Sequence, residues 1–197
     1  MSAARDRLLS AGLKLFSEKR SKAVSVTELA REANVARSTV YNLAPDMDAL
    51  FSDVAERVTV EFNKTLTASL DGITDPALRL AFSLAMPLEQ FHNDPLAGRF
   101  VTEFGLRERR IRKYWFGVPS AALIDGVAEG RFHLRESQIP LFRGQMSGGL
   151  LSTMLLIQDG QAGWREAADC FVALQLRALG LCDNDIENLK ADFFWSP

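Results

Sequence analysis

SVTELAREANVARSTVYNLAPDMDAL, the stretch from Ser25 to Leu50, decides the fold of this chain. Ser25 followed by Glu28 is a capping box, in which the serine accepts a hydrogen bond from the backbone of residue 28 and the glutamate reaches back to the serine. Apolar residues then recur at helical spacing, so one short helix buries that face. Asn34 ends this helix, because asparagine tolerates the left-handed backbone that turns the chain outward.

A second short helix is predicted from Ala36 to Asn42, with Val40 facing inward. Pro45 stops it and Asp46 caps the next helix. Two short helices joined by a tight turn form a helix-turn-helix, whose second helix can enter the major groove of DNA. A helical hairpin inside a larger bundle is the plainer alternative.

The residue types on the outer face suit contact with DNA. Arginine can bind a guanine edge through two hydrogen bonds, asparagine can pair with adenine, and hydroxyl groups can hold phosphates. The expected DNA-binding residues are Ser25, Thr27, Arg37, Ser38, Thr39, Tyr41 and Asn42.

The same stretch resembles the N-terminal domain of TetR-type (tetracycline-repressor-like) transcriptional regulators. Their pattern runs roughly Thr-Val-x-x-Ile-Ala-x-x-Ala-Gly-Val-Ser-x-Gly-Thr-Leu-Tyr-x-Tyr-Phe-x-Ser-Lys-x-x-Leu. This chain has the same or a similar residue at Ser25, Val26, Leu29, Ala30, Ala33, Val35, Thr39, Val40, Tyr41, Asp46 and Leu50. It departs from the pattern at Asn34, Ala36, Ser38, Leu43-Ala44 and Met47. Ala36 and Met47 remove polar groups where the family contacts phosphate.

The resemblance implies an all-α protein with two parts. Residues 1–50 are expected to form a three-helix DNA-binding domain with the helix-turn-helix. A long helix from Asp46 to about Leu70 should join it to a helical effector-binding and dimerisation domain, residues 51–197. The implied function is a one-component regulator, a repressor whose binding to a palindromic operator in double-stranded DNA is released by a small-molecule effector. The alternative is an all-α ligand-binding or enzymatic protein that no longer binds DNA.

In chains resembling this family, the second domain encloses a mostly apolar effector pocket, the usual form of such sites. Large apolar side chains lie on the inward faces of several predicted helices, and they either line such a pocket or fill the core. The candidates are Phe62, Phe82, Met86, Phe100, Phe104, Trp115 and Met154.

Further helices follow from caps, prolines and apolar periodicity, and two of them are apolar on more than one face. Such helices are buried in a core or against a partner chain, which predicts a homodimer through these two, with Gly148-Gly149 allowing close approach. The two are Gln138–Gln158 and Trp164–Leu181. The remaining predicted helices are Ser2–Glu18, Pro76–Phe91, Pro95–Phe104, Leu106–Phe116, Pro119–Glu129 and Asp185–Phe194.

Composition limits the alternatives. The chain has 197 residues, of which 47% are hydrophobic, and a net charge of −2, as in an ordinary globular protein. Residues 1–45 carry eight Lys/Arg and four Asp/Glu, so the predicted DNA-binding head is basic and the remainder acidic. Two cysteines without a pairing pattern and the absence of a membrane-length apolar run indicate a reduced, cytoplasmic protein without membrane contact.

No enzyme signature is evident. The two histidines lack a second ligand at metal spacing, and the chain shows no nucleophile elbow, phosphate loop or dinucleotide fingerprint. We therefore expect no catalytic residues, metal site or cofactor. The basic run Arg107–Lys113 beside Tyr114-Trp115-Phe116 is either a solvated helix face or the mouth of a site for an anionic or aromatic ligand.

Overall fold

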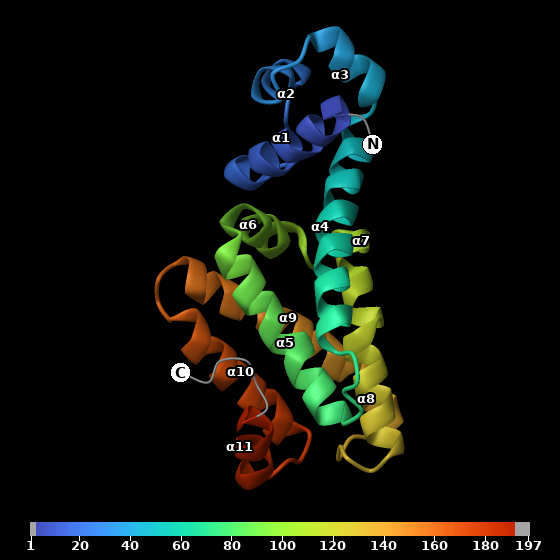
Figure 1. Ribbon diagram of the computed structural model, residues 1–197, viewed down its shortest axis with the longest axis vertical. Helices are drawn as coiled ribbons and strands as arrows, with labels where there is room; N and C mark the ends of the chain where they lie inside the picture. The colour runs from blue at the N-terminus through green and yellow to red at the C-terminus, as the bar shows by residue number, and fades with distance from the viewer. Residues whose placement is uncertain (1–2, 192–197) are drawn as a thin grey trace.

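The chain forms a small helical head at one end of a long helix and a larger helical body along its other half (Figure 1). A computed structural model describes residues 3–191, which form helices and connecting segments without a strand. The head contains α1 (Ala3–Lys19), α2 (Val26–Glu32) and α3 (Arg37–Leu43), and α4 (Met47–Ser69) runs from the head into the body. The predicted all-α class is confirmed.

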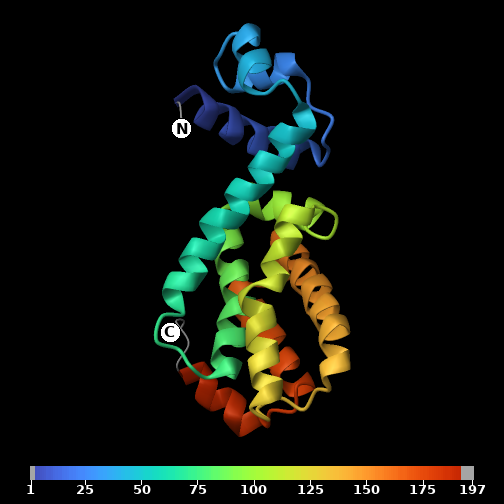
Figure 2. The ribbon, with the colours of Figure 1, turned by 90° about the vertical axis from the view of Figure 1, so that its right-hand side faces the viewer.

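The body is arranged around one central helix. Its helices are α5 (Pro76–Asn93), α6 (Pro95–Phe104), α7 (Arg109–Arg112), α8 (Val118–Ala128), α9 (Ile139–Gln158), α10 (Trp164–Ala178) and α11 (Asp183–Ala191), with short 3-10 segments η1 (Lys113–Phe116) and η2 (Glu136–Gln138). α5 packs against α6, α8, α9 and α10, and Figure 2 shows α5, α8 and α9 running roughly along the long axis of the molecule. Among residues 3–191, no helix is long and apolar enough to cross a membrane.

Aspartates begin three of the helices, among them the predicted cap Asp46. Asp46 accepts a hydrogen bond from the backbone of Asp48 at 2.9 Å, and Asp75 accepts one from Ala77 at 2.8 Å. Asp94 caps α6 in the same way, with its carboxylate 3.1 Å from the backbone nitrogen of Ala97. Each cap satisfies a backbone donor that has no partner inside its helix.

A cluster of aromatic rings joins the head to the body. Phe51, on α4, is fully buried and contacts Phe16 of α1 with ring centroids 5.0 Å apart. On its other side lie Phe100 and Phe104 of α6, at 5.2 and 4.9 Å. One continuous core therefore runs through α1, α4 and α6.

Polar contacts reinforce this junction at two places. The buried Ser17 hydroxyl of α1 donates to the backbone oxygen of Leu96 in α6 at 2.9 Å. Arg110 of α7 donates to the backbone oxygen of Ser52 at 3.0 Å and lies 3.5 Å from the Asp53 carboxylate. The proposed division at residue 50 stays a prediction, and its two sides share both packing and polar contacts.

The predicted helix Leu106–Phe116 is broken in the structure. Glu108 accepts a hydrogen bond from the backbone of Arg110 and so begins a new short helix, α7. The chain continues as the tighter 3-10 helix η1, which is capped at its end by Gly117. The predicted stretch contained this internal cap, which apolar periodicity alone does not reveal.

The ends of the last two helices also differ from the sequence prediction. α10 stops at Ala178 rather than Leu181, because Gly180 adopts a left-handed backbone with φ of 93°. α11 begins at Asp183, two residues earlier than expected. Its predicted end at Phe194 lies outside the described residues.

The first prediction concerns the close contact between α5 and α6. A Cβ atom on Gly98 would lie 2.5 Å from the backbone oxygen of Phe91, which has little freedom to move. Gly98→Ala should therefore lower the free energy of unfolding by about 1–3 kcal/mol, measured by urea denaturation. Gly144, also inside a helix, has nothing within 4 Å of such a Cβ, so Gly144→Ala is the control and should not destabilise. Equal stability of the two variants would contradict this account of the α5–α6 contact.

Candidate DNA-binding face and effector cavity

The start of α2 is fixed by the predicted capping box. Ser25 accepts a hydrogen bond from the backbone nitrogen of Glu28 at 3.2 Å, and Glu28 accepts one from the backbone of Ser25 at 3.0 Å. The Glu28 carboxylate also pairs with Lys19 at 2.6 Å. The bond from Lys19, followed by those from Ser25, lowers the pKa of Glu28 to about 2. The Ser25 hydroxyl is thus already engaged in positioning α2, whereas Thr27 is exposed beside it.

The turn and the second helix follow the sequence prediction. Asn34 has a left-handed backbone, with φ of 51°, and Val35 closes the turn by donating to the Ala30 oxygen at 3.0 Å. The fully buried Val40 anchors α3 against the head. Ala36 provides no side-chain cap, so the first backbone N–H groups of α3 lack a side-chain partner.

The outer face of α3 is polar and accessible. Tyr41 is 61% exposed, Arg37, Ser38 and Asn42 are exposed, and Thr39 is half-buried. Within residues 3–191, these five side chains have no ion pair or hydrogen bond to other side chains or backbone groups. α3 lies at the end of the molecule farthest from the body, so this face is free to meet a partner (Figure 1).

Several basic residues of the head pair with carboxylates of the head or of the body. Lys14 pairs with Glu32 at 2.6 Å, and the pair raises the pKa of Lys14. Lys22 lies 3.6 Å from Glu108 and over the ring of Phe51. Arg37 is therefore the positive charge on α3 that remains available to an external anion.

The body contains a buried apolar cavity of about 30 Å³ between α4, α5, α6, α9 and the α7–η1 segment. Its polar atoms are already satisfied: the Thr59 hydroxyl donates to the Ala55 oxygen at 2.8 Å, and the Tyr114 hydroxyl donates to the Ser83 oxygen. Burial raises the pKa of Tyr114, which stays neutral. The lining residues are Val58, Thr59, Phe62, Pro87, Phe91, Val101, Gly105, Ile111, Tyr114, Trp115, Leu150 and Leu151.

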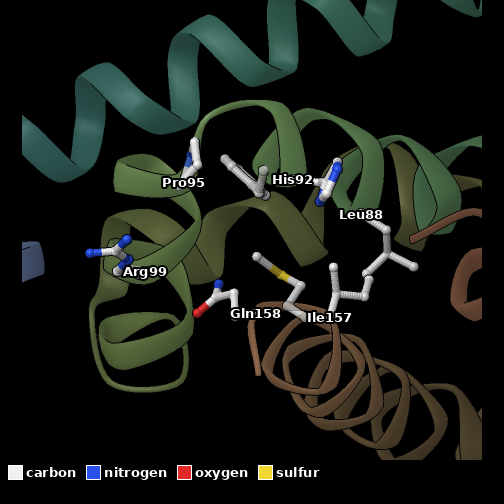
Figure 3. A pocket seen from close by; sticks show the side chains of 8 residues that line it. Leu88, His92, Pro95, Arg99, Ile157 and Gln158 are labelled. Carbon is white, nitrogen blue, oxygen red and sulfur yellow. The ribbon is translucent and has the colours of Figure 1, made fainter. Parts of the chain in front are cut away.

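A surface cleft of about 230 Å³ lies beside this cavity (Figure 3). Its rim carries His92 from α5, Arg99 from α6 and Gln158 from α9, around an apolar floor. Phe91 borders both the cleft and the buried cavity. The lining of the cleft consists of Leu88, Phe91, His92, Pro95, Arg99, Met154, Ile157 and Gln158, without a carboxylate.

The predicted pocket residues fall into different places. Phe62 and Trp115 line the buried cavity, and Met154 lines the cleft. Phe100 and Phe104 instead pack on Phe51 at the junction with the head. Phe82 and Met86, on α5, are buried and half-buried and are not among the residues lining either space.

Sequence reasoning missed Phe91, Ile111 and Tyr114 as cavity residues. The sequence places Phe91 at the end of a predicted helix and Tyr114 beside a basic run, and neither position indicates a cavity. Within that run, Arg110 contacts α4, so it is neither a wholly solvated face nor free for a ligand.

An apolar face remains uncovered on α9 and α10. Leu141 and Leu155 of α9 are 78% and 43% exposed, and Leu174 of α10 is 54% exposed. Leu141 and Leu174 also border a shared groove between the two helices. Exposed apolar area of this kind often marks a protein–protein contact.

The two adjacent glycines of α9 face in different directions. A Cβ atom on Gly148 would meet nothing within 4 Å, whereas one on Gly149 would lie 2.8 Å from the ring of Phe171 in α10. Gly149 therefore allows close packing inside this chain. The expectation that Gly148 serves contact with a second copy stays a prediction, whereas the close contact of Gly149 is made within the chain.

Comparison with known proteins agrees with this combination of a helix-turn-helix head and a helical body. Residues 8–54 match the family model described as bacterial regulatory proteins, tetR family. An uncharacterised HTH-type transcriptional regulator of Mycobacterium tuberculosis (strain ATCC 25618 / H37Rv) is 28% identical over 100 residues, which are 50% of each chain. The match thus spans about half the length of that relative.

Solved structures share the fold over nearly the whole chain. One is a Shewanella sp. PV-4 protein assigned to the tetR family of transcription regulators, with a TM-score of 0.78, 20% identity, and 91% of this chain and 99% of that chain covered. Another is RolR in complex with its ligand resorcinol, with a TM-score of 0.68, 22% identity, and 97% and 94% covered. The tetR family model thus matches the helix-turn-helix head, and the whole chain shares the fold of these solved structures.

The second prediction concerns the pH dependence of the head. Folding lowers the pKa of Glu28 from 4.5 to about 2. The stabilisation of the fold by the ionised Glu28 carboxylate is therefore complete above about pH 4.5 and is lost as the pH falls toward 2. The difference in unfolding free energy between the wild type and Glu28→Gln should therefore shrink over that range in urea denaturation. Lys19→Met, which removes the main cause of the shift, should remove part of the same dependence. A difference in unfolding free energy that stays constant with pH would contradict the lowered pKa of Glu28.

Proposed function

We propose that this protein is a one-component transcriptional regulator that binds double-stranded DNA and represses until a small-molecule effector releases it. The observation that carries the proposal is the exposed outer face of α3, whose polar side chains have no partners within the described residues. A regulator of this kind acts in the cytoplasm, where its DNA lies, and the proposal assigns it no catalysis.

In the proposed complex α3 enters the major groove. Arg37, at the start of α3, contacts a base edge or an adjacent phosphate. Tyr41 anchors a phosphate through its hydroxyl, and Asn42 lies one residue further along the helix. Thr27, Ser38 and Thr39 complete the contact set, and Ser25 serves it by positioning the start of α2. Met47 is half-buried and apolar, so it contributes no phosphate contact.

We propose that two copies associate through the exposed face of α9 and α10. Leu141, Leu155 and Leu174 supply the apolar area, and the open side of Gly148 lets the helices approach. A two-fold axis through a four-helix contact would bring the same patch of each copy together. Two heads would then read half-sites about 34–36 Å apart, which requires a palindromic operator.

The body supplies the effector site in this proposal. An apolar cavity bounded by α4 lies beside a larger cleft, and a protein of the same fold, RolR, binds resorcinol. An effector that favours one spacing of the heads by about 1–3 kcal/mol would change DNA affinity roughly 5–150-fold. DNA would weaken effector binding by the same factor, because the coupling is reciprocal.

The third prediction tests DNA binding directly. Selection from a randomised DNA pool should yield a palindrome, and Arg37→Ala should weaken binding to it by about 1–3 kcal/mol per specific contact while relaxing preference at one position in each half-site. Gel-shift titration at fixed salt measures both. Arg135→Ala, in the body, is the matched control and should bind like the wild type. Failure to enrich any sequence would overturn the proposed function, and unchanged affinity and preference would remove Arg37 from the contact set.

The fourth prediction tests the association of two copies. Leu174→Arg places a charge in the proposed contact, where it would lack a partner, and should produce monomers in sedimentation velocity. Val60→Arg is the control, because Val60 is exposed to a similar extent, at 58%, but lies on α4. A Leu174→Arg protein that remains dimeric would place the contact elsewhere. Gly149→Arg is unsuitable as a test, because it would disrupt the packing of Phe171 within the chain.

A further inference from the structure

Phe91 lines both the surface cleft and the apolar cavity. It borders both spaces, is 8% exposed, and stacks on Phe62 with ring centroids 5.5 Å apart. The cavity, at about 30 Å³, is far smaller than the few hundred Å³ of an ordinary ligand pocket. A ligand that uses this apolar space must therefore extend into a neighbouring space. Phe91 also lines two such spaces, and the cleft is the larger of them and the one without a carboxylate in its lining.

The backbone around Phe91 is held in place, whereas its side chain lines open space. Gly98 of α6 comes so close that a Cβ atom there would lie 2.5 Å from the Phe91 oxygen, and Asp94 donates to the Gln90 oxygen at 2.9 Å. Motion at this point is therefore rotation of the ring. Rotation would join the cavity of about 30 Å³ to the cleft of about 230 Å³.

The two spaces offer opposite chemistry. In the cavity the Thr59 and Tyr114 hydroxyls donate to backbone oxygens, so the space favours hydrocarbon. The cleft has Arg99 at its rim, which makes no ion pair or hydrogen bond within residues 3–191. Gln158 reaches across from α9, with its amide nitrogen 2.9 Å from the Thr102 hydroxyl. Figure 3 shows Arg99 and Gln158 at the same end of the cleft, with Leu88 at the other.

We propose that the effector is a carboxylate with an alkyl chain. Its carboxylate pairs with Arg99 at the rim, its chain crosses the apolar floor formed by Leu88 and Met154, and its end passes Phe91 into the cavity. Phe91 acts as the gate between the two spaces. This inference rests on the proposed function and names the ligand class for that function.

The position of α6 explains how such a ligand would reach the head. α6 carries Arg99 at the cleft and Val101 at the cavity, and the Leu96 oxygen accepts the hydrogen bond from Ser17 of α1. The ligand would therefore contact an element that the head also contacts. Ligand binding and the release of DNA can be measured separately. The ligand class is therefore tested with the protein alone, in the absence of DNA.

The fifth prediction uses octanoate and octanol as probes in isothermal titration calorimetry. Arg99→Gln should weaken octanoate about three- to five-fold, the range of an exposed ion pair, and leave octanol unchanged. Arg107→Gln is the matched control, an exposed arginine outside both linings, and should change neither. Absence of octanoate binding, or equal loss of both probes in Arg99→Gln, would overturn the proposed class. Failure of the wild type to bind DNA would instead count against the proposed function and leave the binding result standing.

The gate is tested with carboxylates of increasing chain length, from hexanoate to dodecanoate. Each buried methylene should improve affinity about four-fold until the joined space is full. Phe91→Leu should preserve this gain, and the larger ring of Phe91→Trp should end it at the length that fills the cleft. The same gain in both variants would overturn the gate.

If Phe91→Trp does not fold, dodecanoate brominated at its terminal carbon tests the wild type, because the tail of this ligand should quench the fluorescence of Trp115 in the cavity. Quenching equal to that of a Trp115→Phe variant would also overturn the gate.

Discussion

The packing of Phe51 is the contact on which the rest of the structure depends. Its ring is fully buried and touches Phe16 of the head and Phe100 and Phe104 of α6. Burying a side chain of this size contributes about 1.5–3 kcal/mol, and each aromatic pair adds about 0.5–1.5 kcal/mol. Phe51 is the first residue after the proposed boundary, so the head and the body share a core.

A shared core makes the position of α6 important. Interiors are close-packed, so α6 has little room to shift without displacing the rings around Phe51. Ser17 adds a polar contact at this place, because its buried hydroxyl lies 2.9 Å from the Leu96 oxygen and 2.6 Å from the Leu13 oxygen of its own helix. An effector acting on α6 would therefore act on the head through direct contacts, in addition to any change in the tilt of α4.

Local signals made much of the fold predictable, whereas the placement of the cavity depended on tertiary packing. The Ser25 capping box, the left-handed Asn34 and the Asp46 cap each act within a few residues, so the local sequence was sufficient to predict them. An inward-facing aromatic ring can be recognised from periodicity, but the space it meets belongs to another helix. Phe62 thus lines a cavity while Phe100 packs on Phe51, although the sequence pattern treats both alike.

Two departures in the head bear on how regulation would work. Ala36 gives α3 no side-chain cap and Met47 adds no charge, so in the proposed function a single head has fewer means of holding phosphate. Binding would then rely on two linked heads, because the second binds at the high effective concentration that the first imposes. That gain is lost when the spacing of the heads no longer matches the half-sites. A weak single head therefore increases the effect that a small change at α4 or α6 has on DNA affinity.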